Sequence, residues 1–346
     1  MNQIFALLKL LGFSRAIKMK QRHDEANPIL RGYVTTNAVW ALLNTGIMDE
    51  LIQGAVLDPK TAAEKKHLSE EVLEALFHYL FCVDILAKQG KAYVLGPKGK
   101  RLMEEPKGSF HLLYGYEPIF KQLQEMLKNE KVYGKDILRR DEFVARGSGE
   151  LCEQLPYQVM RQMIQEAGIN KVLDLGCGNG QFLAHLASHL DAAYEGFGID
   201  ISKEAVDEAH SHLQSLGLKD KIRVEQADMF QLKQFPQGWP EIEVITAIDV
   251  FHEYLYTGNE RIAGLFKQFK QYFPNTALLV GEFCEQTEER LKSIGSSFVE
   301  HHFFHALSKQ RIVPAEVWRQ MFHDAGYKIE KEQVFDLVGH GYFLLR

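Results

Sequence analysis

The 346-residue sequence predicts an α/β domain built on a mostly parallel β-sheet and preceded by a mostly helical domain. Two observations carry this prediction. Strands alternate with helices from residue 170 onward, and a glycine-rich loop at 176–180 joins the first of these strands to a helix. Before that point the pattern is helical. Because Gly147 and Gly149 indicate a break in the chain, we expect domains at 1–148 and 149–346.

The first domain reads as helices followed by a small hairpin. Residues 33–53 carry apolar side chains at helical spacing, and a second helix is expected at 69–85, with Ser69 as its N-cap. Two short strands about a turn near Gly90 follow. This order resembles a winged helix. The expected recognition helix carries several acidic residues and no arginine, whereas a helix that enters a phosphate-lined groove is usually basic. We therefore expect no nucleic-acid partner.

The second domain begins with a helix at 151–167 and continues with seven strands. Only a short turn separates the last two strands, so these should be antiparallel, whereas helices separate the others. A seven-stranded sheet that ends in an antiparallel hairpin is therefore predicted. The expected strands are 171–175, 194–199, 222–226, 243–248, 277–282, 327–335 and 341–345.

The loop after the first strand has the composition of a nucleoside-binding turn. Asp174 precedes Gly176, Gly178 and Gly180, and a helix with apolar residues at helical spacing follows. Glycine lets a ligand approach the backbone and tolerates positive φ. The dinucleotide fingerprint reads G-x-G-x-x-G, whereas this loop reads G-x-G-x-G.

With Asp174 two residues before the first glycine, this loop resembles motif I of the class I S-adenosylmethionine (SAM) methyltransferases, whose Rossmann-like sheet ends in the same antiparallel hairpin. Asp200 ends the second strand, where a carboxylate accepts hydrogen bonds from ribose hydroxyls. In the family, residues after the third and fourth strands contact adenine, the methionine part and the substrate. The resemblance thus implies a SAM site formed by Asp174, Gly176, Gly178, Gly180, Asp200, Ile201, Asp228, Met229, Ile248 and Asp249.

A winged-helix-like domain ahead of a SAM domain is similar to the two-domain natural-product O-methyltransferases. That resemblance implies a homodimer, a small-molecule methyl acceptor and a general base just after the fourth strand. His252 and Glu253 stand there, and histidine has an ordinary pKa suited to removing a hydroxyl proton. Tyr254 replaces the family's tryptophan. Glu282 and Glu285 are candidate acidic partners of the base by position.

Three histidines at 301, 302 and 305 form a second cluster with spacing that can supply metal ligands. The layout resembles C-methyltransferases that act on α-keto acids and hold a metal between two histidines. The metal candidates are His252, His302 and His305. Metal-assisted C-methylation is therefore the alternative to O-methylation with His252 as base. A further alternative is a SAM-binding regulator without catalysis.

Composition sets broader limits. The net charge of −6 is unlike that of a general nucleic-acid binder, and no apolar run is long enough to span a bilayer. The N-terminal segment is amphipathic; a membrane-surface helix is one interpretation, but packing on its own domain or on a partner subunit is preferred. Four scattered cysteines form no disulfide framework, which favours a cytoplasmic location. We expect a cytoplasmic, dimeric SAM-dependent methyltransferase.

Overall fold

The computed structural model describes residues 2–232, 235, 241–293 and 298–346. The chain forms two compact units, Met1–His111 and Leu112–Arg346. This division lies well before the boundary expected near residue 148. The helices between the two positions belong to the second unit, since Leu112, Tyr116 and Val144 share an apolar cluster with Phe304.

The first unit is mostly helical and ends in the predicted hairpin. Leu86–Gln89 and Ala92–Leu95 pair antiparallel about Gly90, whose φ is +64°. The Ser69 hydroxyl accepts a hydrogen bond from the Val72 N–H, as expected of an N-cap. The elements are α1 (Asn2–Leu11), α2 (Phe13–Asn44), α3 (Ile47–Ile52), α4 (Pro59–Lys66), α5 (Glu70–Cys82), β1 (Leu86–Gln89), β2 (Ala92–Leu95) and α6 (Pro97–Met103), and α7 (Lys107–Lys121) crosses the division.

Helix α2 has two parts with different surroundings. Its C-terminal end is buried in the core of the first unit through Val39, Leu42 and Leu43. The part before residue 35 has few neighbours and exposes large apolar side chains; Ile29 is 76% and Leu30 65% accessible. The apolar content of this segment is therefore not accounted for by packing within the first unit.

The second unit holds a seven-stranded sheet with helices on both faces. Its elements are α8 (Leu123–Leu127), α9 (Asp141–Cys152), α10 (Pro156–Glu166), β3 (Lys171–Leu175), α11 (Gln181–His189), β4 (Glu195–Asp200), α12 (Lys203–Ser215), β5 (Ile222–Gln226), β6 (Val244–Ile248), η2 (Phe251–Tyr254), α13 (Glu260–Tyr272), β7 (Ala277–Phe283), α14 (Glu288–Ser293), α15 (Phe298–Leu307), α16 (Ala315–Asp324), β8 (Ile329–Phe335) and β9 (His340–Leu345).

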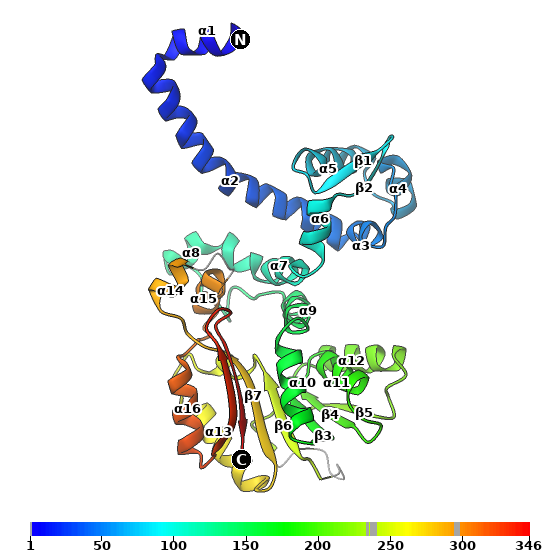
Figure 1. The fold of residues 1–346 in the computed structure, drawn as a ribbon, viewed down its shortest axis with the longest axis vertical. Helices are drawn as coiled ribbons and strands as arrows, with labels where there is room; N and C mark the ends of the chain where they lie inside the picture. The colour runs from blue at the N-terminus through cyan, green and yellow to red at the C-terminus, as the bar shows by residue number, and fades with distance from the viewer. Residues whose placement is uncertain (1, 233–234, 236–240, 294–297) are drawn as a thin grey trace. The chain divides into compact units, whose positions relative to one another are not determined.

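The strand order is β5-β4-β3-β6-β7-β9-β8 (Figure 1). Strands β3 to β7 pair in parallel, whereas β9 pairs antiparallel with both β7 and β8. The predicted terminal hairpin is confirmed. From β3 the chain adds β4 and β5 on one side, and from β6 it adds β7 and the hairpin on the other side. The strand order therefore reverses between β3 and β6, and the crevice outside the carboxyl ends of these two strands is the expected place for a ligand.

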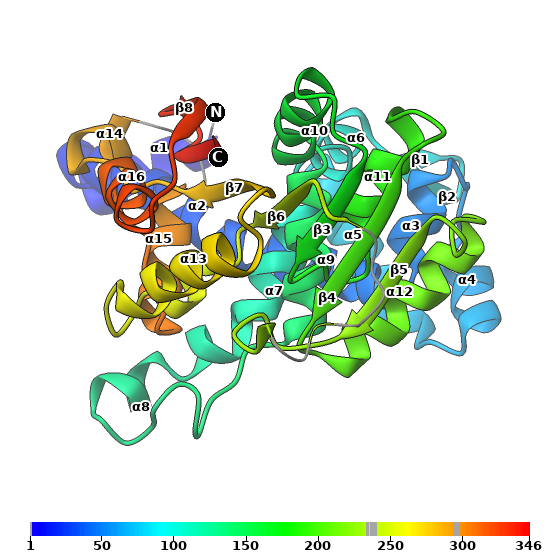
Figure 2. The ribbon, with the colours of Figure 1, turned by 90° about the horizontal axis from the view of Figure 1, so that it is seen from below.

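Alternate strand residues enter two separate cores. Leu173 and Leu175 of β3 face the core that contains α13 and α16. Val172 of β3 faces the other core, formed with α10, α11 and α12. Figures 1 and 2 show these two groups of helices on opposite faces of the sheet. Both faces are thus covered, which explains why the parallel strands read as continuous apolar runs.

The predicted break at Gly147–Gly149 was wrong, because both glycines lie inside the continuous helix α9. The interruption comes a few residues later, before Pro156, which occupies the first turn of α10. Glycine inside a helix costs only about 1 kcal/mol. Proline lacks the N–H needed in a helix interior but fits the first turn, so Pro156 rather than the glycines marks the boundary between the helices.

Within the residues that the structure describes, none of the helices combines the length and the apolar character needed to cross a bilayer.

Candidate active site

A cavity of about 620 Å³ opens at the carboxyl ends of β3, β4 and β6. The glycine loop forms one wall. Gly176 and Gly178 have φ values of +64° and +53°, which side chains rarely adopt. A Cβ on Gly176 would lie 2.8 Å from Val250, whereas one on Gly178 would meet no protein atom. Since Gly178 lines the cavity, its bare backbone leaves room there for a ligand.

Gly180 has a different role from the two glycines before it. It is the N-cap of α11 in a left-handed conformation and is absent from the lining of the cavity. A Cβ there would lie 3.4 Å from Leu213 of α12. That is an ordinary van der Waals distance, so it is the positive φ of the turn (+75°) that favours glycine here, although the pattern had grouped Gly180 with the cofactor-binding residues.

Asp200 is placed to bind a ribose. Its Oδ2 accepts a hydrogen bond from the Gly178 N–H (2.9 Å) and its Oδ1 accepts one from the Ser202 N–H (2.9 Å). Each oxygen keeps a further lone pair, so the carboxylate can still accept from two hydroxyls. Burial raises the pKa of Asp200. The backbone donors oppose this effect only in part, so the pKa stays above its ordinary value.

The other expected cofactor residues also line this cavity. Asp174 is buried and accepts from the Thr246 hydroxyl (2.7 Å), and burial raises its pKa to about 7. Asp228 caps the next turn through the Phe230 N–H (2.9 Å). Met229 is buried, whereas Ile201 is 63% exposed. Asp174 thus links β3 to β6 beside the cavity through Thr246.

A second cavity, of about 280 Å³, adjoins the first. Its walls come from α7, α9, α15, the turn after β6, and the ends of β7 and β9. The two cavities share a small set of lining residues. These side chains form the boundary between a ligand in one cavity and a ligand in the other. The shared residues are Val144, Ser148, Cys152, Asp249 and Glu253.

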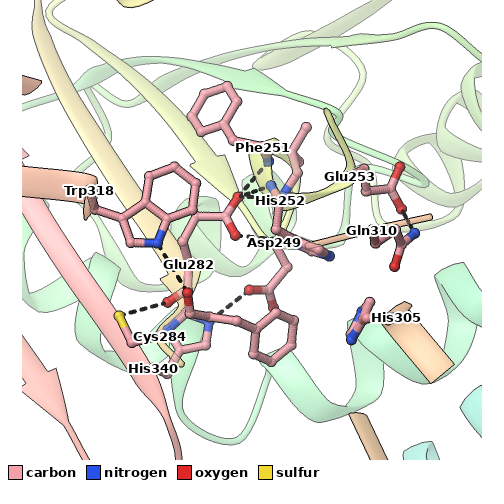
Figure 3. Close-up of polar contacts among 12 residues, drawn as sticks. Asp249, Phe251, His252, Glu253, Glu282, Cys284, His305, Gln310, Trp318 and His340 are labelled. Atoms are coloured by element: carbon pink, nitrogen blue, oxygen red, sulfur yellow. Dashed lines mark hydrogen bonds and ion pairs between the residues drawn. The ribbon is translucent and has the colours of Figure 1, made fainter. Parts of the chain in front are cut away.

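His252 lies in the wall of this second cavity and is paired with Glu282 (Figure 3). Its Nδ1–H donates to Glu282 Oε2 (2.9 Å), and both side chains are buried. Glu282 Oε1 also accepts from the backbone N–H groups of Val250 (2.9 Å), Phe251 and His252 (3.3 Å). One carboxylate therefore fixes both the turn after β6 and the tautomer of the histidine, leaving Nε2 with a lone pair.

The charge of Glu282 also tunes the histidine. Burial by itself disfavours the protonated imidazole, but the neighbouring carboxylate outweighs that effect, and the pKa of His252 lies above its ordinary value. A base of this kind takes up a proton more readily than an unpaired buried histidine.

Among the hydrogen bonds of the described residues, none joins the side chains of Glu253 and His252. Glu253 Oε1 instead accepts from Arg139 (2.8 Å) and from Gln310 (2.9 Å). Arg139 in turn donates to the hydroxyl of Tyr116 (3.2 Å). The acid that hydrogen-bonds the histidine is Glu282 of the neighbouring strand, one of the two candidate partners named by position.

The histidines of α15 lie at different distances from the cavity. His305 is buried, lines the cavity and packs edge-on against His252, with ring centroids 4.9 Å apart. Its Nδ1–H donates to the His301 carbonyl (2.7 Å). Burial, with the nearby His252, holds the pKa of His305 well below its ordinary value. His302 does not line the cavity, although it had been a candidate ligand.

Asp249 belongs to a second acid–histidine pair. It follows β6 with a positive φ of 55°. Its Oδ1 accepts from His340 Nε2–H (2.7 Å), and Cys152 Sγ lies 3.4 Å from Oδ2 (Figure 3 shows the His340 contact). Burial opposes its ionisation, but His340 outweighs that effect, and the pKa of Asp249 lies below its ordinary value. Sequence reasoning did not find His340, because it lies in the last strand, far from any motif.

Among the described residues, ligand atoms of Asp249, His252 and Glu282 lie within 4.8 Å of one another, close enough to share a metal ion. The hydrogen bonds above already occupy these carboxylates, however. The Nε2 atoms of His252 and His305 make no hydrogen bond within the described part of the chain, so these two nitrogens fit a metal better.

Comparison with known proteins agrees with this geometry. A sequence model of a family described as "Methyltransferase domain" matches residues 168–333. A 2-ketoarginine methyltransferase from Streptomyces arginensis is 24% identical over 319 residues, covering 90% of both chains. The methyltransferase ungE' of Aspergillus campestris is 21% identical over 335 residues, covering 90% of this chain and 94% of its own.

Solved structures share the whole fold. The mitomycin 7-O-methyltransferase MmcR superimposes with a TM-score of 0.69 at 15% identity, over 96% of this chain and 99% of its own. Human N-acetylserotonin methyltransferase, solved in complex with SAM, has a TM-score of 0.69 at 16% identity, over 94% and 97% of the two chains.

The glycine loop, the placement of Asp200 and the family match together define a class I methyltransferase fold with a cofactor cavity. The protein is a SAM-dependent methyltransferase.

The cofactor assignment predicts the effect of Asp200→Asn. The amide keeps the size of the side chain but removes the charge that strengthens hydrogen bonds to the ribose. We expect the affinity for S-adenosylhomocysteine, measured by calorimetric titration, to fall about 10-fold. The control is Asp207→Asn, on the exposed face of α12 outside the cavity, which should bind as the wild type does. Equal affinities of both variants would contradict this role of Asp200.

Proposed function

We propose that this enzyme transfers the methyl group of SAM to a small molecule bound in the 280 Å³ cavity, with His252 accepting the proton that the acceptor loses. The observation that carries the proposal is the pairing of His252, which lines the cavity beside the cofactor space, with the buried Glu282. The geometry provides a proton acceptor there, and SAM provides the electrophile.

The reaction needs two changes of bonding. The acceptor's proton passes to His252 Nε2, and the electron pair left behind attacks the methyl carbon of SAM as the carbon–sulfur bond breaks. S-adenosylhomocysteine leaves as a neutral thioether. Glu282 stabilises the imidazolium that forms, because its carboxylate already accepts from Nδ1–H. The enzyme's other contribution is to hold both reactants in line across the shared residues of the two cavities.

We favour a 2-oxo acid as the acceptor. The relative named 2-ketoarginine methyltransferase aligns over 90% of both chains, and 2-ketoarginine is a 2-oxo acid. The carbon beside a ketone is acidic enough for a positioned base, and its enolate is a carbon nucleophile. O-methylation of a hydroxyl remains the second acceptor chemistry, in which His252 would take the same part; two solved structures of this fold are named as O-methyltransferases.

A metal-assisted form of the reaction is supported by a specific observation. His252 and His305 each have Nδ1–H engaged, so each presents a lone pair at Nε2, and their rings lie 4.9 Å apart. Two such nitrogens are suited to a divalent metal. When bound, a metal would polarise the ketone of a 2-oxo acid. In this form His252 and His305 would hold the ion, and His252 would not be the base.

We also propose that the enzyme is a homodimer. The N-terminal part of α2 exposes Ile29, Leu30 and Tyr33, and its buried residues begin only at Ala38. Burial of these side chains against a second copy would remove a large apolar surface from water.

The base assignment predicts a pH dependence. Because the pKa of His252 is raised and the base must be unprotonated, kcat/KM for 2-ketoarginine should rise with pH through an inflection above the ordinary value of about 6.5. His252→Ala should lower kcat at least about 100-fold. Glu282→Gln removes the charge that favours the imidazolium, so its inflection should move to lower pH. An inflection unchanged by Glu282→Gln would contradict the pairing.

His305 distinguishes the two forms of the mechanism. If His252 acts as a base, His305→Ala should lower kcat less than about 10-fold, since His252 keeps its contact with Glu282. If both histidines hold a metal, His305→Ala should cost as much as His252→Ala, and purified protein should contain about one metal ion per chain by elemental analysis. The control is His302→Ala, on the same helix but outside the cavity, which should leave both activity and metal content unchanged.

The dimer is tested by Ile29→Asp combined with Leu30→Asp. Two charges on this surface would have to be buried without partners, so the variant should sediment as a monomer in analytical ultracentrifugation while the wild type sediments as a dimer. Ser211→Asp, on α12 of the second unit, serves as the control and should remain dimeric. A monomeric wild type would contradict the proposal.

A further inference from the structure

Carboxylate side chains are confined to one end of the acceptor cavity. Both of its acids, Asp249 and Glu253, belong to the wall that it shares with the cofactor cavity. Among the described residues that line the acceptor cavity alone, none is an aspartate, glutamate, lysine or arginine. Rings are prominent in this remaining part, and we call five of its residues the aromatic wall: Tyr116, Phe283, Phe298, Phe304 and Tyr342.

The position of the reacting atom decides which part of an acceptor meets the aromatic wall. That atom must lie beside the methyl group of SAM, at the junction of the two cavities. A side chain attached to it then extends away from the cofactor, into the space beside the aromatic wall. The cavity of about 280 Å³ has room for a ring there, since an apolar cavity of about 150 Å³ can hold benzene.

A cationic side chain would find no counter-ion beside the aromatic wall. The two acids at the junction already have partners: Glu253 forms an ion pair with Arg139 (2.8 Å). Asp249 accepts a hydrogen bond from His340 Nε2–H (2.7 Å). His252 has a raised pKa and so takes up a proton more readily than an ordinary histidine, which would repel a second cation. Because burying a charge without a partner is costly, this space disfavours a group such as guanidinium.

The faces of the rings are also poorly placed to attract a cation. Tyr116 and Phe304 stack with centroids 4.2 Å apart, so each covers a face of the other. The Arg139 guanidinium carbon lies 5.9 Å from the centre of the Tyr116 ring, and a second cation would compete with it. Phe283 packs against the ring of His252, with centroids 5.2 Å apart, so a cation over Phe283 would lie beside that histidine.

We propose that the methyl acceptor carries a neutral, apolar side chain, with an aromatic ring preferred, and that the enzyme discriminates against acceptors with a cationic side chain. This inference rests on the proposed function, since it names the class of acceptor for the same cavity. A ring in this space buries a large apolar area and packs against the aromatic wall edge to face or offset. The acceptor would thus differ from 2-ketoarginine, which carries a guanidinium group.

The test compares three 2-oxo acids that differ only in their side chains. Phenylpyruvate carries a phenyl ring, 2-ketoarginine a guanidinium group, and 2-oxo-5-ureidopentanoate a neutral urea of nearly the same size and shape as the guanidinium. For each, kcat/KM is measured with the full-length enzyme saturated with SAM. The value for phenylpyruvate should exceed that for 2-ketoarginine at least about 100-fold. The ureido acid should lie between them, about 10-fold above 2-ketoarginine, because it is polar but uncharged.

A carboxylate introduced beside the aromatic wall should shift this preference. Leu151 of α9 lines the acceptor cavity alone, and glutamate has a helix propensity close to that of leucine. Leu151→Glu should raise kcat/KM for 2-ketoarginine about 10-fold and lower that for phenylpyruvate about 10-fold. The matched control is Leu151→Gln, which has the same length without the charge and should not raise the value for 2-ketoarginine. Calorimetric titration with S-adenosylhomocysteine checks that both variants keep the cofactor site.

A wild-type kcat/KM for 2-ketoarginine equal to or above that for phenylpyruvate would overturn the inference and leave methyl transfer to 2-oxo acids in place. Equal values for 2-ketoarginine and its ureido analogue would also overturn it, because charge would then not decide the preference. If the enzyme methylates none of the three while it still binds S-adenosylhomocysteine, the 2-oxo acid of the proposed function is wrong and the inference is wrong with it. The role of His252 is judged separately by the rate of His252→Ala, since the preference is a ratio between acceptors that share one base.

Discussion

The active site depends on one buried carboxylate. Glu282, at the end of β7, accepts from three successive backbone N–H groups after β6 and from the ring of His252. A buried charge is tolerated only when its hydrogen-bonding capacity is filled, and here the turn and the histidine fill it. The sheet therefore specifies the histidine's position: β6 and β7 are parallel neighbours, and their carboxyl ends bring the two residues together.

Two cavities that share a wall give the fold its chemistry. The glycine loop and Asp200 form a space for a nucleoside cofactor at the switch point between β3 and β6, as in other open α/β sheets. The antiparallel strand β9 extends the sheet beyond β7 and adds His340 and Tyr342 to the neighbouring cavity. The acceptor space is thus built partly from the strand that distinguishes this sheet from a simple dinucleotide-binding one. Helix α15 contributes His305 from a third direction.

Local patterns predicted the strands well, because each parallel strand is a short apolar run followed by a turn. Prediction was poorer where a tertiary contact overrides local preference. Gly147 and Gly149 read as a break but lie within α9, since the packing of that helix offsets the modest cost of glycine. Position alone left both Glu282 and Glu285 as candidate partners of His252, and only the contact between neighbouring strands singles out Glu282. The cytoplasmic location remains a prediction from the scattered cysteines.

By itself, the sequence determined the class of fold and the cofactor: a glycine loop, an acidic residue after the second strand and a terminal hairpin are local features, and each depends on a few neighbouring residues. The resemblance to the two-domain O-methyltransferases also indicated His252, which follows the fourth strand of the second domain. Only the tertiary structure decided which acid serves His252, which histidine of α15 reaches the cavity, and that His340 and Tyr342 line it. The hydrogen bonds that hold His252 and His340 join residues 30 and 91 positions apart in the chain, and no local pattern encodes such contacts.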